Sequence, residues 1–545
     1  MKVTLLAINA KYVHSSLSVW LVAGGVAKYA KNQHEVGVVE ATINQDLNDI
    51  ADLIVRENPD VLGISTYIWN AELLPELLKI LRQKLPNLII VLGGPEASHN
   101  PKYWLNFEVG YVICGEGELA FAMLLDCLAE GDLVGLNRVP GLYYNDYGAI
   151  QSNPLCKPSH EFVNPYCDEY FARLNGRLAY IETSRGCPFS CAYCLSGGDD
   201  VRFFPLNEVR RQMAKLAKSG ARTIKFIDRT FNCNAERARE IFKYIIDFKT
   251  DVCFHFEVAA DLFDDATIEL LNNAPPGRIQ FEIGVQSFNE KTLEAVVRKT
   301  NLAKVEENVS KLLALQNIHI HVDLIAGLPF EDLESFANGF NRAYELGAHV
   351  LQLGFLKLLH GSRLRVQAEE FGVEYCENPP YEVICTRWLS EENLQILKSV
   401  ENALQHTYNR GRFLSAIEYV LTITKLTPFE FYYGLGEVVS AHALSLDIYA
   451  ERFYEYCVGL PNVCQNELRD RIVCDFLQNN HGKNIPKNLK SYGSKRRKVA
   501  AIASEQVGRA INYAECEVLA DGVGIYVDSS RRCPVSGLHK LHFTN

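Results

Sequence analysis

The chain has 545 residues, of which 48% are hydrophobic and 22% are charged, and its formal net charge is −11. This composition supplies apolar side chains for about three or four domains and excludes a disordered protein. The negative charge gives no overall reason to expect nucleic-acid binding. No apolar run reaches the roughly 18 residues of a membrane span. The first residues read as a strand and not as a signal peptide, and the sixteen cysteines are expected to be reduced thiols.

Residues 1–150 alternate short apolar runs with helical patterns, which predicts a parallel sheet covered by helices. Leucines and isoleucines between Glu72 and Leu85 recur at helical spacing. We predict an α/β domain of the Rossmann-like, flavodoxin-like type, in which ligands bind beyond the carboxyl ends of the strands. The predicted strands are Lys2 to Asn9, Glu35 to Glu40, Val61 to Thr66, Leu88 to Gly93 and Gly110 to Cys114.

Small and turn-forming residues gather where the third, fourth and fifth of these strands end. Glycine lets a bulky ligand approach the backbone, although each segment alone is also explained by ordinary turn chemistry. Taken together, the segments predict a ligand site at this edge of the sheet. The residues concerned are Ser65, Thr66, Gly93, Gly94, Pro95, Gly115 and Glu116.

A second alternation of strands and helices follows a linker at 151–175 and fills residues 176–378. Its six βα units predict a partial (βα)6 barrel, in which reacting groups collect at the carboxyl ends of the strands. The predicted strands are Leu178 to Thr183, Thr223 to Asp228, Cys253 to Val258, Arg278 to Val285, His319 to Ile325 and Val350 to Leu356.

Three cysteines, Cys187, Cys191 and Cys194, follow the first barrel strand with the spacing CxxxCxxC. A 4Fe–4S cluster normally has four cysteine ligands, so three would leave one iron open to a small molecule. The alternatives are a structural zinc site or chance. Zinc is disfavoured because a closed zinc site takes four ligands, usually in pairs, and the nearest upstream histidine, His160, has no regular spacing to the cysteines.

This motif, with the aromatic Tyr193 before the last cysteine, resembles the signature of the radical S-adenosylmethionine (SAM) enzymes. The resemblance implies that the open iron binds the amino and carboxylate groups of SAM. It further implies that one electron from the cluster cleaves SAM to methionine and a 5′-deoxyadenosyl radical, which takes a hydrogen atom from the substrate.

The ends of the barrel strands also resemble SAM-binding elements of this superfamily. Asp228 stands where an acidic side chain receives the SAM amino group, although the glycines of the family element are missing. The segments FEIGVQS and DLIAGLPF match further elements close to the cofactor. The resemblance thus implies SAM contacts for Tyr193, Asp228, Glu257, Glu282, Gln286, Ser287, Gly327 and, through its backbone, Leu356.

Together with the cysteine motif, the strand ends of residues 1–150 resemble the cobalamin-binding domain of one large radical SAM class. The resemblance implies cobalamin contacts for the seven residues named there. The alternative is an empty Rossmann-like domain kept for interaction. Many cobalamin domains carry DxHxxG after the first strand, but the aspartate and the glycine are absent around His14. His14 is therefore interpreted as a loop or packing residue and not as a cobalt ligand.

Residues 379–545 lose the βα alternation, and a mainly helical domain of unknown role is predicted there. Within it, the run from Lys483 to Lys498 holds seven basic residues and no acidic one. Such a run is either a solvated linker, which is the favoured interpretation, or a segment that contacts phosphates. No CxxC pair follows Cys194, so a second cluster is not expected.

The favoured hypothesis, implied by the resemblance, is a cobalamin-dependent radical SAM enzyme that methylates an unactivated or poorly nucleophilic centre. A second hypothesis keeps both cofactors but assigns a cyclisation, oxidation or rearrangement. A third is a non-catalytic sensor that binds a cluster, cobalamin and nucleic acid. A small molecule is favoured over RNA or peptide as the substrate, a flavodoxin or ferredoxin is expected as the electron donor, and the location is expected to be cytoplasmic.

Overall fold

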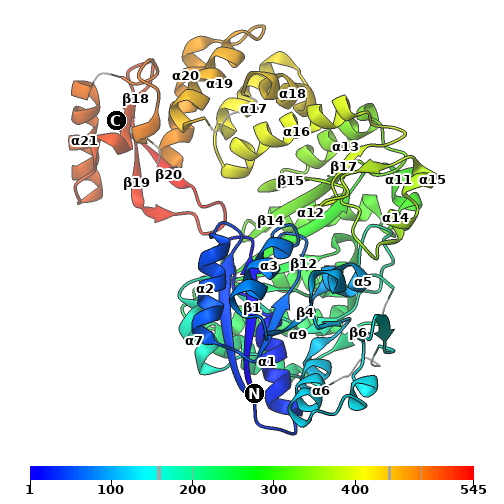
Figure 1. Ribbon diagram of the computed structural model, residues 1–545. Helices are drawn as coiled ribbons and strands as arrows, with labels where there is room; N and C mark the ends of the chain where they lie inside the picture. Colours follow the sequence, from blue (N-terminus) through cyan, green and yellow to red (C-terminus); the bar gives the residue numbers. More distant parts are fainter. Residues whose placement is uncertain (156–160, 199, 440–443, 480–481, 492, 545) are drawn as a thin grey trace.

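The computed structural model describes the whole chain except residues 156–160, 199, 440–443, 480–481, 492 and 545. An N-terminal α/β domain, a partial barrel and a C-terminal helical region with a small sheet follow one another along the chain (Figure 1). Every cysteine among the described residues has a free thiol. Among the described residues, no helix has both the length and the hydropathy that a membrane crossing requires.

The N-terminal domain is built on seven strands. They are β1 (Lys2–Asn9), β2 (Glu35–Thr42), β3 (Val61–Ser65), β4 (Ile89–Gly93), β5 (Tyr111–Ile113), β6 (Leu142–Asp146) and β7 (Ala149–Ser152). Their order in the sheet is β2-β1-β3-β4-β5-β6-β7. The first five are parallel in the flavodoxin-like order, as predicted. β6 and β7 extend the sheet as an antiparallel hairpin that the sequence analysis did not predict.

Helices cover both faces of this sheet. They are α1 (Ser18–Tyr29), α2 (Leu47–Glu57), α3 (Leu74–Lys84), α4 (Pro95–His99), α5 (Pro101–Trp104) and α6 (Gly117–Glu130). Leu5 of β1 belongs to the core on the side of α1 and α6, whereas Leu6 belongs to the core on the side of α2 and α3. Successive strand residues thus face opposite layers, which is why these strands read as continuous apolar runs.

Six parallel strands in sequential order form the predicted partial barrel. They are β8 (Ala179–Ile181), β11 (Thr223–Phe226), β12 (Cys253–Val258), β13 (Ile279–Gln286), β14 (Ile318–Ala326) and β15 (Val350–Phe355). Among the described residues β8 and β15 do not pair, so the barrel is open between them. The flanking helices are α7 (Asp168–Leu174), α8 (Leu206–Leu216), α9 (Ala235–Asp247), α10 (Asp265–Leu271), α11 (Glu290–Ala295), α12 (Leu302–Ala314) and α13 (Leu333–Glu345).

The inner face of the barrel is polar, while its outer face is aromatic. Phe256 and Phe281 pack on Phe242 of α9. The alternate residues point to the other side, where Lys225 of β11 reaches Glu282 of β13 across β12 at 3.0 Å. A closed (βα)8 barrel fills its interior with branched apolar side chains. The polar interior therefore indicates a space for a ligand.

The C-terminal region is mainly helical, as predicted, but it ends in a small lobe with a sheet. Short elements lead into it: α14 (Arg363–Val366), α15 (Ala368–Phe371), β16 (Glu374–Tyr375) and β17 (Val383–Cys385). Its long helices are α16 (Glu391–His406), α17 (Leu414–Thr424), α18 (Pro428–Val439), α19 (Leu446–Val458), α20 (Gln465–Gln478) and α21 (Gly493–Val507). The sheet has three antiparallel strands, β18 (Cys516–Val518), β19 (Gly524–Arg532) and β20 (His539–Thr544). Residues of β18 and β19 pack with α21 in a separate core.

The basic run from Lys483 to Lys498 is folded, so the linker interpretation is wrong for its described residues. Ile485 and Leu489 are 3% and 2% exposed, and the second half of the run forms the start of α21. A solvated linker would leave such side chains in water. The run is therefore part of the C-terminal lobe.

The loop between β19 and β20 reaches back to the start of the barrel strands. Nδ1 of His319, at the beginning of β14, lies 2.7 Å from the carbonyl oxygen of Val535. A Cβ at Gly277, just before β13, would overlap the carbonyl group of Pro534, and the φ of Gly277 is +75°. The lobe thus contacts the amino-terminal end of the barrel, opposite the strand ends that carry the predicted site.

Candidate active site

The cysteines of the CxxxCxxC motif lie in the loop between β9 (Ser184–Arg185) and β10 (Arg202–Phe203). The first two are buried and Cys194 is half-buried. The Ala192 amide donates to the carbonyl of Val296 (2.8 Å), and the Leu364 amide donates to the carbonyl of Ala192 (2.8 Å). The motif is therefore fixed between the end of α11 and the start of α14.

In the described part of the chain, no group of three or more His, Cys, Asp or Glu side chains is placed to hold a single metal ion. Zinc needs four ligand atoms at about 2.0–2.3 Å from one ion, whereas the thiolates of a 4Fe–4S cluster bind separate irons. Cys187, Cys191 and Cys194 stay the predicted cluster ligands.

Arg298, which the sequence analysis did not select, lies beside the motif. Its Nη1 is 3.7 Å from Sγ of Cys191 and 3.4 Å from Oη of Tyr193, and its Nη2 donates to the carbonyl of Gly284. Burial lowers the pKa of this guanidinium, but the opposing effect of Tyr193 and Cys191 is larger, so the net shift of the pKa is upward. The guanidinium therefore holds a fixed positive charge next to the second cysteine of the motif. Arg298 belongs to no local motif, and only the fold brings it to Cys191.

The end of β13 holds Gln286 in a strained conformation. Its φ is +75°, a value that side chains rarely adopt, and the register with β14 shifts between Gly284 and Gln286. A Cβ at Gly284 would overlap the side-chain amide of Gln286, so glycine makes room for that amide. Strain of this kind is concentrated at functional sites, which is in keeping with the predicted SAM contact.

Three other predicted SAM contacts lie in the supporting structure of the strand ends. Ser287 is 2% exposed, and its Oγ donates to Oε1 of Glu331 at 2.5 Å. Gly327 turns the chain after β14 with a φ of +92°. Leu356 is also 2% exposed, and both of its backbone groups are hydrogen-bonded to the protein. For these three residues the SAM contact stays a prediction.

Glu257 and Glu282 share one lysine inside the barrel. Nζ of Lys225 lies 3.4 Å from Oε1 of Glu257 and 3.0 Å from Oε2 of Glu282. Nε2 of His255 lies 2.8 Å from the same Glu282 oxygen. The hydrogen bond from His255, together with Lys225, lowers the pKa of Glu282 to about 2 although burial opposes this shift. Glu282 is therefore an ionised group, and it shares Lys225 with Glu257 on the inner face of the barrel.

Asp228 anchors the segment that leads into the cysteine motif. It is 1% exposed, and its carboxylate accepts hydrogen bonds from the Thr183 amide (3.0 Å), the Thr183 hydroxyl (2.7 Å) and the Ser184 hydroxyl. Desolvation raises its pKa, and these donors oppose the shift. A direct contact with SAM would require this network to be exchanged, so that contact stays a prediction.

Asp323 on β14 is a second residue that the sequence analysis did not select, although it stands in the DLIAGLPF segment. Its Oδ1 is buried and has no hydrogen-bond partner among the described residues. Desolvation first, and then the charges of Glu282 and Glu257, raise the pKa of Asp323 to about 8. An unpartnered buried oxygen is costly and calls for an explanation. One explanation is that this oxygen accepts a hydrogen bond from a hydroxyl or ammonium group of a bound ligand.

Replacing Asp323 with asparagine should stabilise the protein. An aspartate in the unfolded chain ionises near pH 3.9, whereas the folded protein keeps this proton up to about pH 8. Below the pKa of the unfolded chain, Asp323 is protonated in both states and costs the fold nothing. As the pH rises from there to the pKa of the folded protein, the unfolded state becomes increasingly favoured, because only there can the carboxyl group ionise freely. The Tm advantage of Asp323→Asn over the wild type should grow from pH 5 to pH 8 and then level off in scanning fluorimetry. A pH-independent difference would contradict this assignment.

A cavity of about 250 Å³ lies at the carboxyl ends of the N-terminal strands, on the side of α1 and α6. The wall of this cavity is largely apolar, and Leu5, Val22 and Phe121 are among the residues that line it. An apolar slot edged by glycines fits a flat group such as the benzimidazole base of a corrinoid. Five of the seven predicted cobalamin contacts line it: Ser65, Gly93, Gly94, Gly115 and Glu116.

Thr66 and Pro95 lie outside this wall. Thr66 is fully buried, and its Oγ1 donates to the carbonyl of Gly93 (2.7 Å) and accepts from the amide of Ala97 (2.9 Å). Gly94 has a φ of +96°, and a Cβ there would lie 2.5 Å from the Thr66 carbonyl oxygen. Pro95 is the exposed first residue of α4. Both residues shape the glycine loop, and their direct cobalamin contacts stay predictions.

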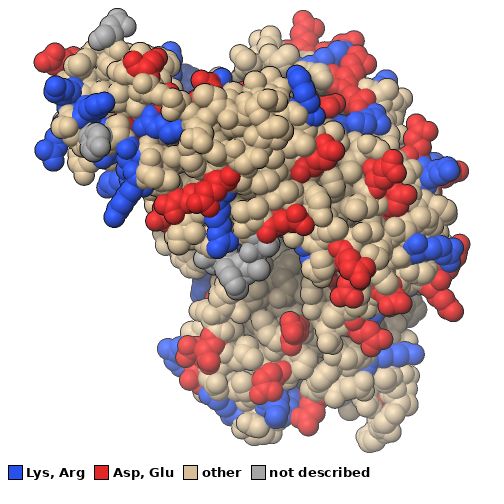
Figure 2. All heavy atoms as spheres, turned by 90° about the horizontal axis from the view of Figure 1, so that it is seen from above, with Lys and Arg blue, Asp and Glu red and all other residues tan. Residues whose placement is uncertain are grey.

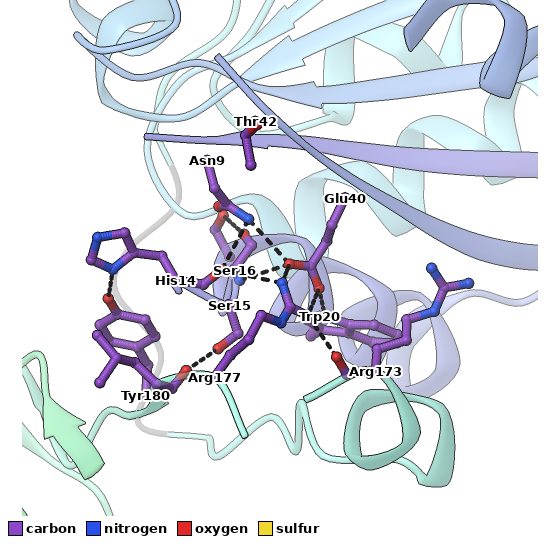
Figure 3. Close-up of polar contacts among 12 residues, drawn as sticks. Asn9, His14, Ser15, Ser16, Trp20, Glu40, Thr42, Arg173, Arg177 and Tyr180 are labelled. Carbon is purple, nitrogen blue, oxygen red and sulfur yellow. Dashed lines mark hydrogen bonds and ion pairs between the residues drawn. The ribbon is translucent and has the colours of Figure 1, made fainter. Parts of the chain in front are cut away.

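Figure 3 shows how the loop after β1 joins the N-terminal domain to the barrel. Arg177, just before β8, forms an ion pair with Glu40 of β2 at 2.7 Å, and these side chains are 9% and 8% exposed. His14 points to Tyr180 of β8, with Nδ1 2.5 Å from the hydroxyl oxygen. A histidine held in this way has the packing role that the sequence favours.

A second junction joins α4 to the region after the barrel. Glu96 accepts a hydrogen bond from the hydroxyl group of Tyr381. Glu96 is buried, and desolvation raises its pKa. This junction begins two residues after Gly94, so it fixes the glycine loop of the cavity against the barrel.

Arg185 forms a third junction, two residues before the cysteine motif. Its guanidinium contacts Glu116 (3.3 Å) and Glu118 (2.5 Å) of the N-terminal domain and Glu182 (2.9 Å) after β8. Arg202 of β10 also pairs with Glu116. Desolvation raises the pKa of Glu182 to about 7, although Arg185 opposes the shift. Because Arg185 also lines the 250 Å³ cavity, the cavity and the cysteine loop share a wall.

Arg185→Ala should lower the free energy of unfolding by about 3 kcal/mol, because it leaves the largely buried carboxylates of Glu118 and Glu182 without this partner. Urea denaturation followed by circular dichroism would measure the change. Arg173 pairs with Glu169 on the surface, where the side chains are 42% and 45% exposed, so Arg173→Ala should cost less than about 1 kcal/mol. Equal effects of the two substitutions would show that Arg185 does not hold the domains together.

Comparison with known families assigns all three parts of the chain. Residues 3–125 match the B12 binding domain, residues 181–342 match the Radical SAM superfamily, and residues 369–515 match a family described as protein of unknown function (DUF4080). The first two domains are those of the predicted cofactors, cobalamin for one and a 4Fe–4S cluster with SAM for the other.

The chain is also similar to individual proteins. The chain is 24% identical to the cobalamin-dependent radical SAM methyltransferase TokK of Streptomyces tokunonensis, over 62% of this chain and 53% of TokK, so it spans about half the length of that relative. It is 24% identical to an uncharacterized methyltransferase of Pyrococcus horikoshii, over 62% of this chain and 76% of that protein. The fold is similar to that of the cobalamin-dependent SAM radical enzyme OxsB, with a TM-score of 0.63 at 15% identity over 93% of this chain and 81% of OxsB. The chain thus combines a region that matches the B12 binding domain, a barrel region that matches the Radical SAM superfamily and a following region that matches DUF4080.

Proposed function

We propose that this protein is a cobalamin-dependent radical SAM methyltransferase. The observation that carries the proposal is the wall shared by the two sites: Arg185 lines the cavity of the B12-binding domain and stands two residues before the cysteine motif. A corrinoid in the first site and a cluster in the second would be neighbours across this side chain. The similarity to methyltransferases such as TokK supports the proposal.

When bound, the cluster and SAM supply a 5′-deoxyadenosyl radical, and cobalamin supplies a methyl group for the substrate. The side chains of the protein hold and orient these groups. The motif cysteines provide three thiolates, and Arg298 places a positive charge beside Cys191. Glu257 and Glu282 offer acceptors for hydroxyl and ammonium groups inside the barrel, and the protonated Asp323 offers both a donor and an acceptor. The ion pairs between the domains keep both sites against one inner space.

The proposal includes a flavodoxin or ferredoxin as electron donor, because SAM cleavage consumes an electron. It also includes a small-molecule substrate with an unactivated or poorly nucleophilic centre, since a radical route is needed where direct transfer from SAM fails. The polar inner face around Lys225 and Glu257 suits a substrate with hydrogen-bonding groups.

The test uses anaerobic protein with a reconstituted cluster and hydroxocobalamin, incubated with dithionite and SAM that carries a deuterated methyl group. Mass spectrometry should detect the labelled methyl group on the bound corrinoid, together with S-adenosylhomocysteine and 5′-deoxyadenosine. 5′-Deoxyadenosine alone, without labelled corrinoid, would favour radical chemistry without methyl transfer. The absence of both nucleosides would contradict an enzymatic role.

A further inference from the structure

We propose that the C-terminal lobe, made of the described residues between 482 and 544, binds single-stranded nucleic acid through a basic face of α21. This inference does not depend on the proposed methyl transfer. Residues 482–544 hold eleven Lys and Arg against five Asp and Glu, while the whole chain has a formal net charge of −11. Figure 2 shows lysine and arginine side chains gathered on the lobe at the upper left. A basic body on an acidic protein is typical of polyanion binding.

The cations of α21 are not neutralised by acidic residues of the lobe. Lys495, Arg497 and Lys498 are exposed, and none of the ion pairs of the lobe's described residues involves them. Glu517 is fully buried, and Asp528 pairs with arginine side chains outside α21. The positive charges of α21 are therefore free to attract phosphates.

An aromatic ring stands within the basic face. The guanidinium of Arg496 lies over the ring of Tyr513 at 5.4 Å, and Tyr513 is 49% exposed. Tyr513 begins the short turn η7 (Tyr513–Glu515), which packs against α21. An exposed ring next to arginine offers a stacking surface for an unpaired base, while neighbouring basic side chains reach the backbone. This combination favours single-stranded nucleic acid over an acidic protein.

The apolar side of α21 is already used within the lobe. Val499, Ala500 and Ala503 pack with Tyr526 in the core of the lobe, and Ile502 is the one large apolar side chain of α21 that is exposed. A helix that lies on a membrane inserts a broad apolar face between the lipids. Because α21 has no such face to offer, its charges fit nucleic acid better than an anionic membrane.

The experiment measures how the full-length, cofactor-reconstituted protein binds a fluorescein-labelled single-stranded RNA of about 20 nucleotides, with DNA of the same sequence in parallel. Fluorescence anisotropy is recorded between about 50 and 200 mM KCl, the range over which phosphate contacts weaken strongly. The variant K495E/R497E/K498E should weaken binding about tenfold or more. It should also reduce the slope of log Kd against log salt by about 2, because each lost phosphate contact contributes about 0.7.

Two further variants separate charge from stacking and from general effects. Tyr513→Leu should weaken binding about fivefold at an unchanged salt slope, because it removes a stacking ring and no charge. The control K215E/K218E/K243E reverses three exposed lysines around α8 and α9 and should leave Kd unchanged. If the charge-reversal variant of α21 loses its circular dichroism spectrum, K495Q/R497Q/K498Q repeats the test.

Three results would overturn the proposal. The first is no binding of RNA or DNA at about 50 mM KCl, where electrostatic contacts are strong. The second is equal binding by the wild type and the α21 variants. The third is α21-dependent binding to phosphatidylglycerol vesicles that is tighter than binding to either nucleic acid. None of these results bears on SAM cleavage, so the two proposals fail separately.

Discussion

Cys191→Ala protein should keep its fold and its bound corrinoid but form no 5′-deoxyadenosine above background. Three thiolates hold three irons of the predicted cluster and leave the fourth iron to SAM. Removing one of them should abolish the visible absorbance of the cluster and the iron content of the purified protein. Cys191 is buried next to Arg298, so its loss also removes the sulfur atom that this guanidinium contacts.

Cys233 provides a matched control. It is a half-buried thiol at the end of the turn η3 (Phe231–Cys233), and its pKa is raised by burial and then by the charge of Cys187. It is thus near the motif without belonging to it. Cys233→Ala should retain the cluster and SAM cleavage. Loss of the cluster in this variant would make Cys233 a fourth ligand and contradict the open iron, and normal cleavage by Cys191→Ala would contradict the motif assignment.

Val22→Trp should purify with little cobalamin while it still cleaves SAM. Val22 of α1 lines the 250 Å³ cavity, and an indole ring there would occupy the space of the ligand. Overpacking of this kind costs about 1–3 kcal/mol, which corresponds to roughly 5-fold to 150-fold in affinity. The cysteine motif is untouched, so 5′-deoxyadenosine should still form when the corrinoid content has fallen to about a tenth or less.

The control for this effect lies on the same helix. Ala27 of α1 is exposed and does not line the cavity, so Ala27→Trp should bind as much cobalamin as the wild type. The corrinoid is measured by its absorbance after protein denaturation. A Val22→Trp variant with a full complement of corrinoid would place the ligand outside this cavity.

The sequence predicts the sheet frameworks well, because buried parallel strands are apolar runs between turn residues. Lys2–Asn9 and Cys253–Val258 have the predicted bounds, and the other predicted strands of the two sheets differ by one or two residues at one or both ends. The location of the site follows from the rule that parallel strand ends meet at one edge. That rule brings Ser65, Gly93 and Gly115 to one cavity without any knowledge of side-chain contacts.

The contacts within the site could not be predicted in the same way. Arg298 reaches Cys191 from a turn far along the chain, and the exceptional position of Asp323 follows from a missing partner, which no local pattern reports. Thr66 and Ser65 are neighbouring small polar residues, but the fold buries Thr66 and exposes Ser65 to the cavity. The sheet of β18 to β20 was not predicted, because its strands are interrupted by polar residues and pair only with each other.

The contact between Val535 and His319 spans 216 residues of chain. At a synthesis rate of about 5–20 residues per second, the β19–β20 loop leaves the ribosome roughly 10 to 40 seconds after β14. During that interval the amino-terminal end of the barrel lacks one of its packing partners. Maturation of the barrel is therefore completed late in translation, and a stalled nascent chain that stops before Cys533 should expose His319 and Gly277 to solvent and to chaperones.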